Sequence, residues 1–408
     1  MYLKLDKSEI KPVSELTITG SKSESNRLLL LQAQFPEIEI SNLSNSDDSK
    51  VMQKALANYH EVIDIHHAGT AMRFLTAFFA AKENHEVMLT GSDRMKQRPI
   101  AILVDALREL GAQIDYLEDV GCPPLKIKGQ NLLKNKVSLN ANVSSQYISA
   151  LLLIAPKLQN GLELTLQGKI TSIPYIKMTL ALLNEIGVKT SFESNVIKVF
   201  PLTSEISNSS ITVESDWSSA SYFYSIVAMS PVDTEIVLSS YREDSLQGDA
   251  VLSEIYRGFG VETSYFGGKI KLKKIEEVTT DGIELNLNKA PDIAQTIAVT
   301  CLGLGLGCEL KGLHTLKIKE TDRLEALKIE IEKLGGKIKV SENQLNLEPK
   351  ADLKSNVDIS TYNDHRMAMA FAPLSLKTKL NIKDADVVTK SYPRFWDDLK
   401  LIRFKISQ

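Results

Sequence analysis

The sequence predicts a mixed α/β protein with two domains that are built from repeated units. Its 408 residues are more than one small domain usually contains. Four stretches share the order helix, glycine, strand, and their glycines are Gly111, Gly187, Gly260 and Gly335. These glycines lie about 75 residues apart. Such regular spacing indicates that one α/β unit recurs along the chain.

Each copy has helical apolar spacing before its glycine and strand-like alternation after it. A glycine at this point suits a left-handed helix C-cap, because it has no Cβ to oppose a positive φ. A weaker copy spans residues 51–65 with His60 at the glycine position, and residues 394–402 suggest a sixth copy. Short strand-like runs that end in glycine precede polar stretches, as at residues 14–20, 85–91 and 162–168. We therefore expect strand-end loops that face a shared cleft.

Composition and charge exclude several classes of protein. The 48 Lys and Arg against 51 Asp and Glu give a net charge of −3, which argues against nucleic-acid binding through bulk positive charge. Cys122, Cys301 and Cys308 form no CxxC pair and no cluster with zinc spacing, so we expect reduced thiols and no metal. The first residues lack an apolar signal core and no segment has the length of a membrane span, which predicts a cytoplasmic protein.

Several polar segments at expected helix starts concentrate cations, hydroxyls and groups that transfer protons. In the first segment, Lys22, Ser23 and Arg27 precede an apolar helix. Backbone N–H groups at a helix start, hydroxyls and two cations together suit an oxyanion. An N-cap followed by a solvated first turn explains this segment equally well.

Two further segments have weaker signals when each is considered alone. Gly69 and Ala71 would let a ligand approach the backbone closely, although tight helix packing is the stronger interpretation. Three cations crowd a turn before the next helix, and such a cluster is usually a solvated loop. These cations are Arg94, Lys96 and Arg98.

Two later helix starts are more specific. Ser144, Ser145 and Gln146 stand ready to donate hydrogen bonds to a phosphate, whereas capping by one serine does not account for the group of three. His365 alone would more often be structural. Arg366 beside it is harder to dismiss, because an unpaired arginine at a buried helix start is costly.

Two carboxylates are candidates for acid and base. Asp292 follows a proline before a long apolar helix, where capping against the helix dipole is a sufficient explanation. Glu320 lies with Lys319 and Arg323 at the start of an amphipathic helix. This group is either a solvated helix cap or the rim of a site that handles an anion.

Taken together, these stretches closely resemble the 5-enolpyruvylshikimate-3-phosphate synthase family. A single tetrapeptide could match by chance, but the ordered set is highly specific. The matching pieces follow the family's order from residue 20 to residue 393: GSKSESNR, AGTAMR, LTGSDRMKQRPI, VSSQ, SIPYI, PDIAQTIA, KETDRL, TYNDHRMAM and TKSYP.

The resemblance implies a two-domain inverse α/β barrel. Each domain would have three repeated βαβαββ units, with helices inside and sheets outside. Residues 1–19 and 215–408 would form the first, discontinuous domain, and residues 20–214 the second. The active site would lie in the interdomain cleft, which closes on substrates about hinges at the crossing points.

The resemblance also implies a reaction. The enolpyruvyl group of phosphoenolpyruvate would pass to the 5-hydroxyl of shikimate 3-phosphate by addition and elimination through a tetrahedral intermediate, with release of phosphate. This is a step of the shikimate pathway, which leads to chorismate and the aromatic amino acids. Both substrates carry a phosphate and a carboxylate, so guanidinium and ammonium groups are natural partners. The resemblance implies a monomer without cofactor, nucleic-acid partner or membrane partner.

The family's motifs assign roles to particular residues. Asp292 would accept the proton of the 5-hydroxyl, Glu320 would protonate the methylene carbon and later remove a proton, and Lys22 would assist both steps. The implied residues for shikimate 3-phosphate are Lys22, Ser23, Arg27, Ser144, Ser145, Gln146, Ser172, Tyr175, Asp292 and Lys319. Those for phosphoenolpyruvate are Lys22, Gly69, Arg98, Gln146, Arg323, His365, Arg366 and Lys390.

Two positions depart from the family pattern. His67 and Thr315 each stand where the family commonly has Asn, so no role is carried over to them. At the start of the amphipathic helix, Thr321 is the expected cap and Asp322 a solvated or salt-bridged neighbour.

Two alternatives were weighed against this function. The sister enzyme that acts on UDP-N-acetylglucosamine often has a cysteine in the loop at residues 91–99, and this loop has none. A non-catalytic phosphometabolite-binding protein would not need both Asp292 and Glu320, since two carboxylates in an anion site otherwise oppose binding.

Overall fold

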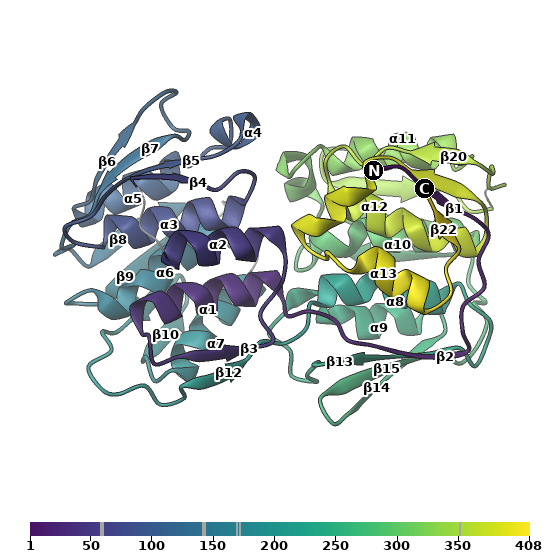
Figure 1. Cartoon of the computed structure of the whole chain (residues 1–408), viewed down its shortest axis with the longest axis horizontal. Coiled ribbons are helices and arrows are strands. Elements are labelled where there is room, and N and C mark those ends of the chain that lie inside the picture. Colours follow the sequence, from purple (N-terminus) through teal and green to yellow (C-terminus); the bar gives the residue numbers. More distant parts are fainter. Residues whose placement is uncertain (58–60, 141–143, 169, 171–172, 351) are drawn as a thin grey trace. The chain divides into compact units, whose positions relative to one another are not determined.

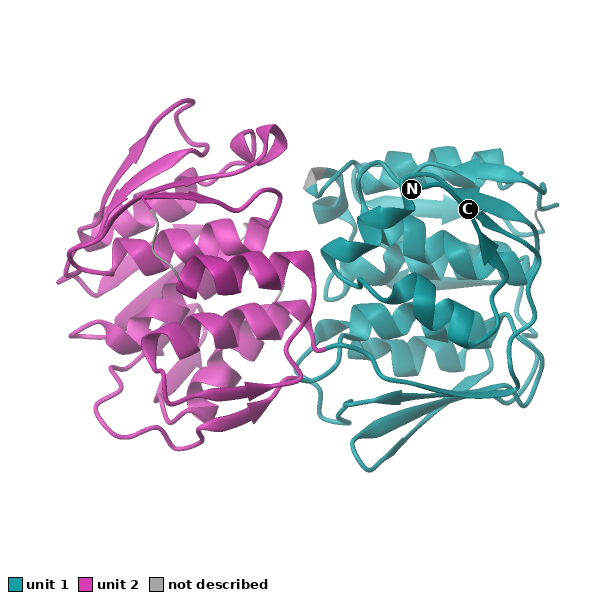
Figure 2. Cartoon of the chain, viewed as in Figure 1, with its two compact units in different colours: residues 1–19, 214–408 teal, residues 20–213 magenta. Residues whose placement is uncertain are grey.

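The chain forms two compact units. The computed structural model describes residues 1–57, 61–140, 144–168, 170, 173–350 and 352–408. Unit 1 contains residues 1–19 and 214–408, and unit 2 contains residues 20–213 (Figure 2). Glu214 therefore belongs to unit 1, whereas the sequence analysis placed this residue in the second domain.

Unit 1 has three four-stranded sheets with one shared topology (Figure 1). In each sheet the first two strands are parallel, and a third and fourth strand complete it in antiparallel pairings. In sheet order, the first consists of β2 (Val13–Leu16), β13 (Glu235–Ser239), β15 (Lys269–Lys274) and β14 (Val261–Phe266). The second consists of β16 (Gly282–Asn286), β17 (Gly307–Lys311), β19 (Gln344–Leu347) and β18 (Ile338–Val340). The third consists of β20 (Val357–Ile359), β21 (Leu380–Ile382), β1 (Leu3–Leu5) and β22 (Ile406–Ser407).

Unit 2 repeats this topology in two four-stranded sheets. One consists of β4 (Val62–Asp64), β5 (Glu86–Thr90), β7 (Leu125–Lys128) and β6 (Gln113–Tyr116). The other consists of β8 (Lys136–Asn140), β9 (Leu162–Gln167), β11 (Val196–Val199) and β10 (Thr190–Glu193). Among the described residues the remaining sheet has only the parallel pair β3 (Glu39–Ser41) and β12 (Ser210–Thr212).

The helices form the interior of each unit because the central ones are apolar on all sides. Every residue of α10 (Ala294–Leu304) from Ala294 to Leu302 is buried, and so is nearly all of α3 (Gly69–Ala80). Strands such as β8 alternate buried and exposed residues, so the sheets have an outer face toward solvent. The other unit 1 helices are α8 (Trp217–Ala228), α9 (Leu252–Arg257), α11 (Arg323–Lys333), α12 (His365–Phe371) and α13 (Phe395–Leu401). Those of unit 2 are α1 (Lys22–Gln34), α2 (Asp47–Ala57), α4 (Asp93–Lys96), α5 (Ala101–Leu110), α6 (Ser145–Ile154) and α7 (Ile173–Glu185).

The four glycines of the sequence repeat all have left-handed backbone conformations. Their φ angles are 112° at Gly111, 96° at Gly187, 73° at Gly260 and 97° at Gly335. The expected left-handed C-cap is confirmed at Gly111, and Gly335 directly follows Leu334, the C-cap of α11. The C-cap of α9 is Gly258, so the expectation of a cap at Gly260 was wrong: this glycine turns the chain two residues later. His60, expected at the same place in a weaker copy, lies outside the described residues. No helix in the described part of the chain is both long and apolar enough to span a membrane.

Gly129 directly follows β7 and tests how tightly the end of this strand packs against the neighbouring backbone. A Cβ at this position would lie 1.8 Å from the backbone oxygen of Lys82. We expect Gly129→Ala to lower the free energy of unfolding by about 1–3 kcal/mol through overpacking. Gly258→Ala is the control, because φ is −65° there and the nearest neighbouring atom would be 3.3 Å away. Urea unfolding of both variants measures the difference, and equal stabilities would contradict the packing described.

Candidate active site

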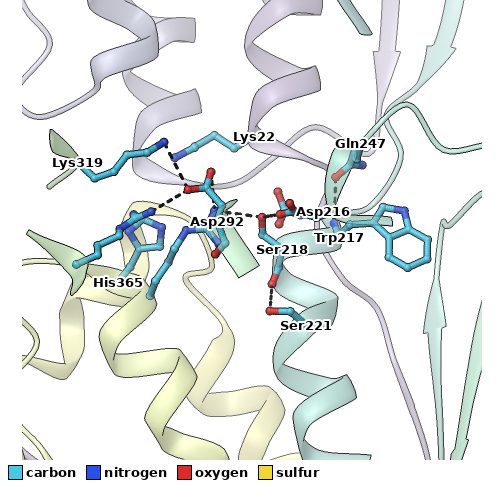
Figure 3. A network of polar contacts seen from close by, with 12 residues as sticks. Lys22, Asp216, Trp217, Ser218, Ser221, Gln247, Asp292, Lys319 and His365 are labelled. Carbon is cyan, nitrogen blue, oxygen red and sulfur yellow. Dashed lines mark hydrogen bonds and ion pairs between the residues drawn. The ribbon is translucent and has the colours of Figure 1, made fainter. Parts of the chain in front are cut away.

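Asp292 of unit 1 lies among three cations. It belongs to the 3₁₀ turn η3 (Pro291–Ile293) directly before α10. Its carboxylate oxygens are 3.4 Å from Lys319 Nζ, 2.9 Å from Arg323 Nη1 and 3.5 Å from Arg366 Nη2 (Figure 3). Burial opposes ionisation of Asp292, but the charges of Lys319, Arg366 and Arg323 outweigh it and lower the pKa of the carboxyl well below its usual range. Asp292 is therefore ionised at neutral pH.

Arg323 links three carboxylates from different elements. Its side chain is only 2% exposed. It donates to Asp364 Oδ2 at 2.6 Å, to Glu320 Oε2 at 2.8 Å and to Asp292 Oδ1 at 2.9 Å. Burial alone would lower the pKa of Arg323, but these carboxylates raise it above the ordinary value. We call Asp292, Lys319, Glu320, Arg323, Asp364 and Arg366 the ion-pair cluster.

Aspartates cap the two helices that carry the arginines of the cluster. Asp322 accepts hydrogen bonds from the backbone N–H groups of Leu324 and Glu325, at 3.1 and 3.2 Å. The expectation that Thr321 caps α11 was therefore wrong, because the Asp322 carboxylate fills that position. Asp364 accepts from the backbone N–H of Arg366 at 2.9 Å and so caps α12 while it also holds Arg323.

Arg366 has partners on two sides. Nη1 donates to the backbone oxygen of Asp292 at 3.1 Å, and Nη2 donates to Ser218 Oγ at 3.1 Å. Ser218 in turn donates its hydroxyl hydrogen to Asp249 in the turn η2 (Gly248–Val251). Burial raises the pKa of Asp249 to about 6. Sequence reasoning missed Ser218 and Asp249, although each lies in a short polar stretch at a helix start.

Two more expected residues of unit 1, His365 and Lys390, lie near Asp364 of the cluster on two different elements. His365, the first residue of α12, is buried with Nδ1 3.8 Å from Asp364 Oδ1. Lys390 ends the turn η6 (Ala385–Lys390) and donates to the backbone oxygen of Asn363 at 2.6 Å. Thr315, a departure from the family pattern, has a buried hydroxyl without a hydrogen-bond partner among the described residues.

In unit 2, α1 begins with a capped and ion-paired turn. Ser21 is the N-cap and accepts from the backbone N–H of Glu24 at 3.5 Å. Lys22 Nζ lies 3.5 Å from Asp48 Oδ2 on α2, a pairing that the sequence analysis did not predict. His67 Nε2 lies 3.9 Å from the other oxygen of Asp48. His67, which departs from the family pattern, therefore lies next to Asp48, the carboxylate that pairs with Lys22.

Arg27 is a buried cation with no carboxylate at ion-pair distance among the described residues, although the charge of Glu24 acts on it from farther away. Within the described part of the chain its guanidinium donates only to neutral oxygens. These are Ser23 O at 2.7 Å, Thr179 Oγ1 at 2.8 Å, Ser149 Oγ at 2.9 Å and Tyr175 O at 3.4 Å. Burial lowers the pKa of Arg27 to about 10, so it still carries its charge at neutral pH. A fixed cation without a described carboxylate is suited to an anionic ligand.

Two guanidinium groups, those of Arg73 and Arg98, lie at the start of α3. A Cβ on Gly69 would lie 2.6 Å from Arg98 Nη1, so the glycine lets the guanidinium lie close to the helix start and a larger residue would make it shift. Arg73, one turn later, donates to the backbone oxygens of Gly69 and Pro99 at 3.0 and 3.2 Å. Burial and the charge of Arg98 lower the pKa of Arg73 to about 10.

The start of α6 adjoins the start of α3. Gln146 Nε2 donates to Thr70 Oγ1 at 3.2 Å. Ser144 is the N-cap of α6 and accepts from the backbone N–H of Gln146 at 3.3 Å, whereas Ser145 is buried as the first helical residue. Unit 2 thus gathers cations, hydroxyls and an amide at the starts of α1, α3 and α6. The expected residue Ser172 lies outside the described residues.

Comparisons with known proteins identify the family. The family model for EPSP synthase (3-phosphoshikimate 1-carboxyvinyltransferase) matches residues 49–399. A 3-phosphoshikimate 1-carboxyvinyltransferase of Bacteroides fragilis is 46% identical over 415 residues, covering 99% of this chain and 98% of that protein. The Histophilus somni enzyme of the same name is 34% identical, covering 98% and 99%. The chain belongs to the EPSP synthase family.

Solved structures agree on the fold. An EPSP synthase from Acinetobacter baumannii matches with a TM-score of 0.82 at 21% identity, with all of both chains covered. The enolpyruvyl transferase NikO from Streptomyces tendae matches with a TM-score of 0.75 at 12% identity, covering 100% of this chain and 98% of that one. The expected fold, an inverse α/β barrel, is confirmed. The expected activity is that of the family, so the protein is an enzyme that transfers an enolpyruvyl group from phosphoenolpyruvate to shikimate 3-phosphate.

The lowered pKa of Asp292 predicts how the stability of this EPSP synthase depends on pH. A carboxyl whose folded-state pKa is depressed stabilises the folded protein at neutral pH, and this contribution is lost as the pH falls from about 5. Asp292→Asn keeps the shape of the side chain and leaves the three cations without its charge. We expect the wild type to be the more stable protein at pH 7 and the difference to shrink steadily toward pH 3.

Urea unfolding at a series of pH values measures this difference. Asp115→Asn, which changes an exposed strand carboxylate outside the cluster, is the control. A stability difference for Asp292→Asn that stays constant down to pH 3 would show that its carboxylate gains nothing from the three cations.

Proposed function

We propose that the ion-pair cluster of unit 1 both binds the substrates' anionic groups and performs the proton transfers of the EPSP synthase reaction. The observation that carries this proposal is the position of Asp292 among Lys319, Arg323 and Arg366. A structural ion pair needs one cation, whereas Asp292 has three around it. An incoming anion would compete for these cations with Asp292, Glu320 and Asp364, which pair with them in the free protein. Arg323 also holds Glu320, so the two candidate proton-transfer groups share one cation.

Anion binding would change the chemistry of Asp292. Without substrate, the three cations make its carboxylate a weak base. A substrate carboxylate or phosphate that takes hydrogen bonds from Arg323 and Arg366 weakens their hold on Asp292. The pKa of Asp292 then rises, and the carboxylate becomes able to accept the proton of the 5-hydroxyl as that oxygen attacks C2 of phosphoenolpyruvate. Substrate binding itself would therefore prepare the base.

Glu320 is suited to the second proton transfer. One of its oxygens accepts from Arg323, and its side chain is 28% exposed, so it is more accessible than Asp292. In the addition step it would donate a proton to the methylene carbon. In the elimination step it would remove a proton from the resulting methyl group as the C–O bond to phosphate breaks. The same group thus acts first as acid and then as base.

The unit 2 residues serve the same two substrates in this proposal. Arg27 has a buried charge that no described carboxylate pairs, which supports its assignment with Ser23 to the carboxylate of shikimate 3-phosphate. Tyr175 and Gln146 would line that site. The hydroxyls of Ser144, Ser145 and Ser172 would bind the phosphate of shikimate 3-phosphate.

The rest of the proposal concerns phosphoenolpyruvate, the location of the enzyme and its oligomeric state. Lys22 and Arg98 would bind phosphoenolpyruvate together with Arg323, Arg366 and Lys390, with Gly69 leaving space and His365 beside it. Lys22 would also stabilise the tetrahedral intermediate. We further propose that the enzyme is a cytoplasmic monomer that needs no cofactor.

A phosphate-release assay tests the function. Purified protein with both phosphoenolpyruvate and shikimate 3-phosphate should release inorganic phosphate steadily, and neither substrate alone should support release. UDP-N-acetylglucosamine in place of shikimate 3-phosphate should support none. Binding of both substrates without turnover would instead identify a phosphometabolite-binding protein, and turnover with UDP-N-acetylglucosamine would identify the sister activity.

The role of Glu320 predicts a separation of turnover from binding. Glu320→Gln keeps the side chain's size but removes its acid–base function, so kcat should fall about 10²- to 10⁴-fold. The Kd for shikimate 3-phosphate, measured by calorimetry, should change much less. Glu325→Gln is the matched control, because Glu325 is an exposed residue in the first turn of the same helix. Comparable losses in turnover and binding for Glu320→Gln would show that its role is wrongly assigned.

A further inference from the structure

Nη2 of Arg366, which lies 3.5 Å from Asp292 Oδ2, also contacts a serine that is itself fixed by a buried carboxylate. Nη2 of Arg366 donates to Ser218 Oγ at 3.1 Å, and Ser218 donates its own hydrogen to Asp249 Oδ2. A serine hydroxyl has a single hydrogen. Because that hydrogen goes to Asp249, the lone pairs of Ser218 remain available to the guanidinium.

Asp249 is held in place by the residues before it. Gln247 accepts from the backbone N–H of Trp217 at 3.0 Å (Figure 3). It also donates to the backbone oxygen of Ser215 at 2.9 Å. These bonds tie the segment before η2 to the start of α8, the helix that carries Ser218. Asp249 itself is 4% exposed. The carboxylate therefore has little freedom to leave Ser218.

Helix capping does not explain the Ser218–Asp249 contact. The N-cap of α8 is Asp216, which accepts from the backbone N–H of Ser219 at 2.7 Å. Ser218 is thus free of the capping role, and its hydroxyl bonds are directed to Arg366 and Asp249. A buried carboxylate whose pKa is raised to about 6 costs stability, so a structural purpose alone is a poor explanation for it.

We propose that Ser218 and Asp249 are positioning residues for Arg366, which they hold in the orientation that binds phosphoenolpyruvate and contacts Asp292. This inference rests on the proposed function, in which Arg366 binds that substrate. A guanidinium is a rigid planar group, so a partner at Nη2 also limits the direction in which Nη1 can donate. The bond to Ser218 accordingly aims Nη1 at the backbone oxygen of Asp292, 3.1 Å away.

Kinetics of a small set of variants test this role. Ser218→Ala and Asp249→Ala should each raise the KM for phosphoenolpyruvate about 10- to 100-fold, the effect of a lost hydrogen bond to a charged group. The KM for shikimate 3-phosphate should stay within about twofold. The KM of the double variant for phosphoenolpyruvate should be at most about threefold higher than that of the more impaired single variant, because both residues act through the same contact.

Two further variants separate positioning from a general structural effect. Ser218→Thr keeps the hydroxyl and should recover most of the wild-type KM for phosphoenolpyruvate. Ser221→Ala removes another hydroxyl of α8, one that bonds to the backbone oxygen of Ser218 and not to Arg366. It should leave both KM values within about twofold. Equal effects of Ser218→Ala and Ser221→Ala, or independent effects of Ser218→Ala and Asp249→Ala that multiply, would overturn the inference.

Calorimetry and crystallography give readouts that do not require turnover. The Kd for phosphoenolpyruvate in the presence of shikimate 3-phosphate should rise in Ser218→Ala as its KM does. A crystal structure of that variant should show the Arg366 guanidinium turned away from the Asp292 backbone oxygen. An unmoved guanidinium with unchanged affinity would contradict the positioning role even if the wild type is active. A wild type that binds both substrates without turnover would contradict the proposed function instead, and the same Kd comparison would still decide the role of Ser218.

Discussion

The buried guanidinium of Arg323 is held by carboxylates at fixed positions, and the ion-pair cluster of unit 1 is built around it. Arg323 is 2% exposed and has carboxylates from η3, from Glu320 two residues before the α11 cap, and from the α12 cap. Taking such a charge out of water is costly unless each donor finds a partner. Arg323 therefore ties three elements that are distant in sequence into one arrangement. The positions of Asp292, Glu320 and the start of α12 all depend on it.

The same arrangement explains how one set of charges can bind anions and move protons. In the free enzyme the cations of the cluster are largely neutralised by its own carboxylates, which avoids an unpaired buried charge. In the proposed function, an incoming anion would compete for these cations and leave the carboxylates more basic. The start of α1 follows the same principle, since Lys22 is paired with Asp48. Arg27 differs, because in the described part of the chain its guanidinium donates only to neutral oxygens and the charge of Glu24 acts on it without a direct ion pair.

Much of the fold could be predicted from the sequence because its signals are local. The apolar surface of α10, the alternation within the strands and the C-cap glycines each depend on a few neighbouring residues. The two-stranded sheet of β3 and β12 could not be predicted in this way, because it joins residues 39–41 to residues 210–212. Its formation depends on where the chain enters and leaves unit 2, which no local pattern records.

The residues of the candidate site also differ in whether local sequence could predict them. Ordered motifs identified most members of the ion-pair cluster, since each motif lies at one helix start. Their partners depend on long-range packing: Ser218 meets Arg366 across 148 positions. Even the cap of α11 was assigned to Thr321, because threonine and aspartate are both good caps and only the observed backbone places Asp322 at that position.

The most direct measurement is a crystal structure of the slow Glu320→Gln variant with phosphoenolpyruvate and shikimate 3-phosphate bound. The account predicts anionic substrate oxygens within hydrogen-bond distance of Arg323 and Arg366, longer contacts from these cations to Asp292, and the 5-hydroxyl beside the Asp292 carboxylate. Substrates bound away from the cluster, with the contacts of Asp292 unchanged, would contradict it.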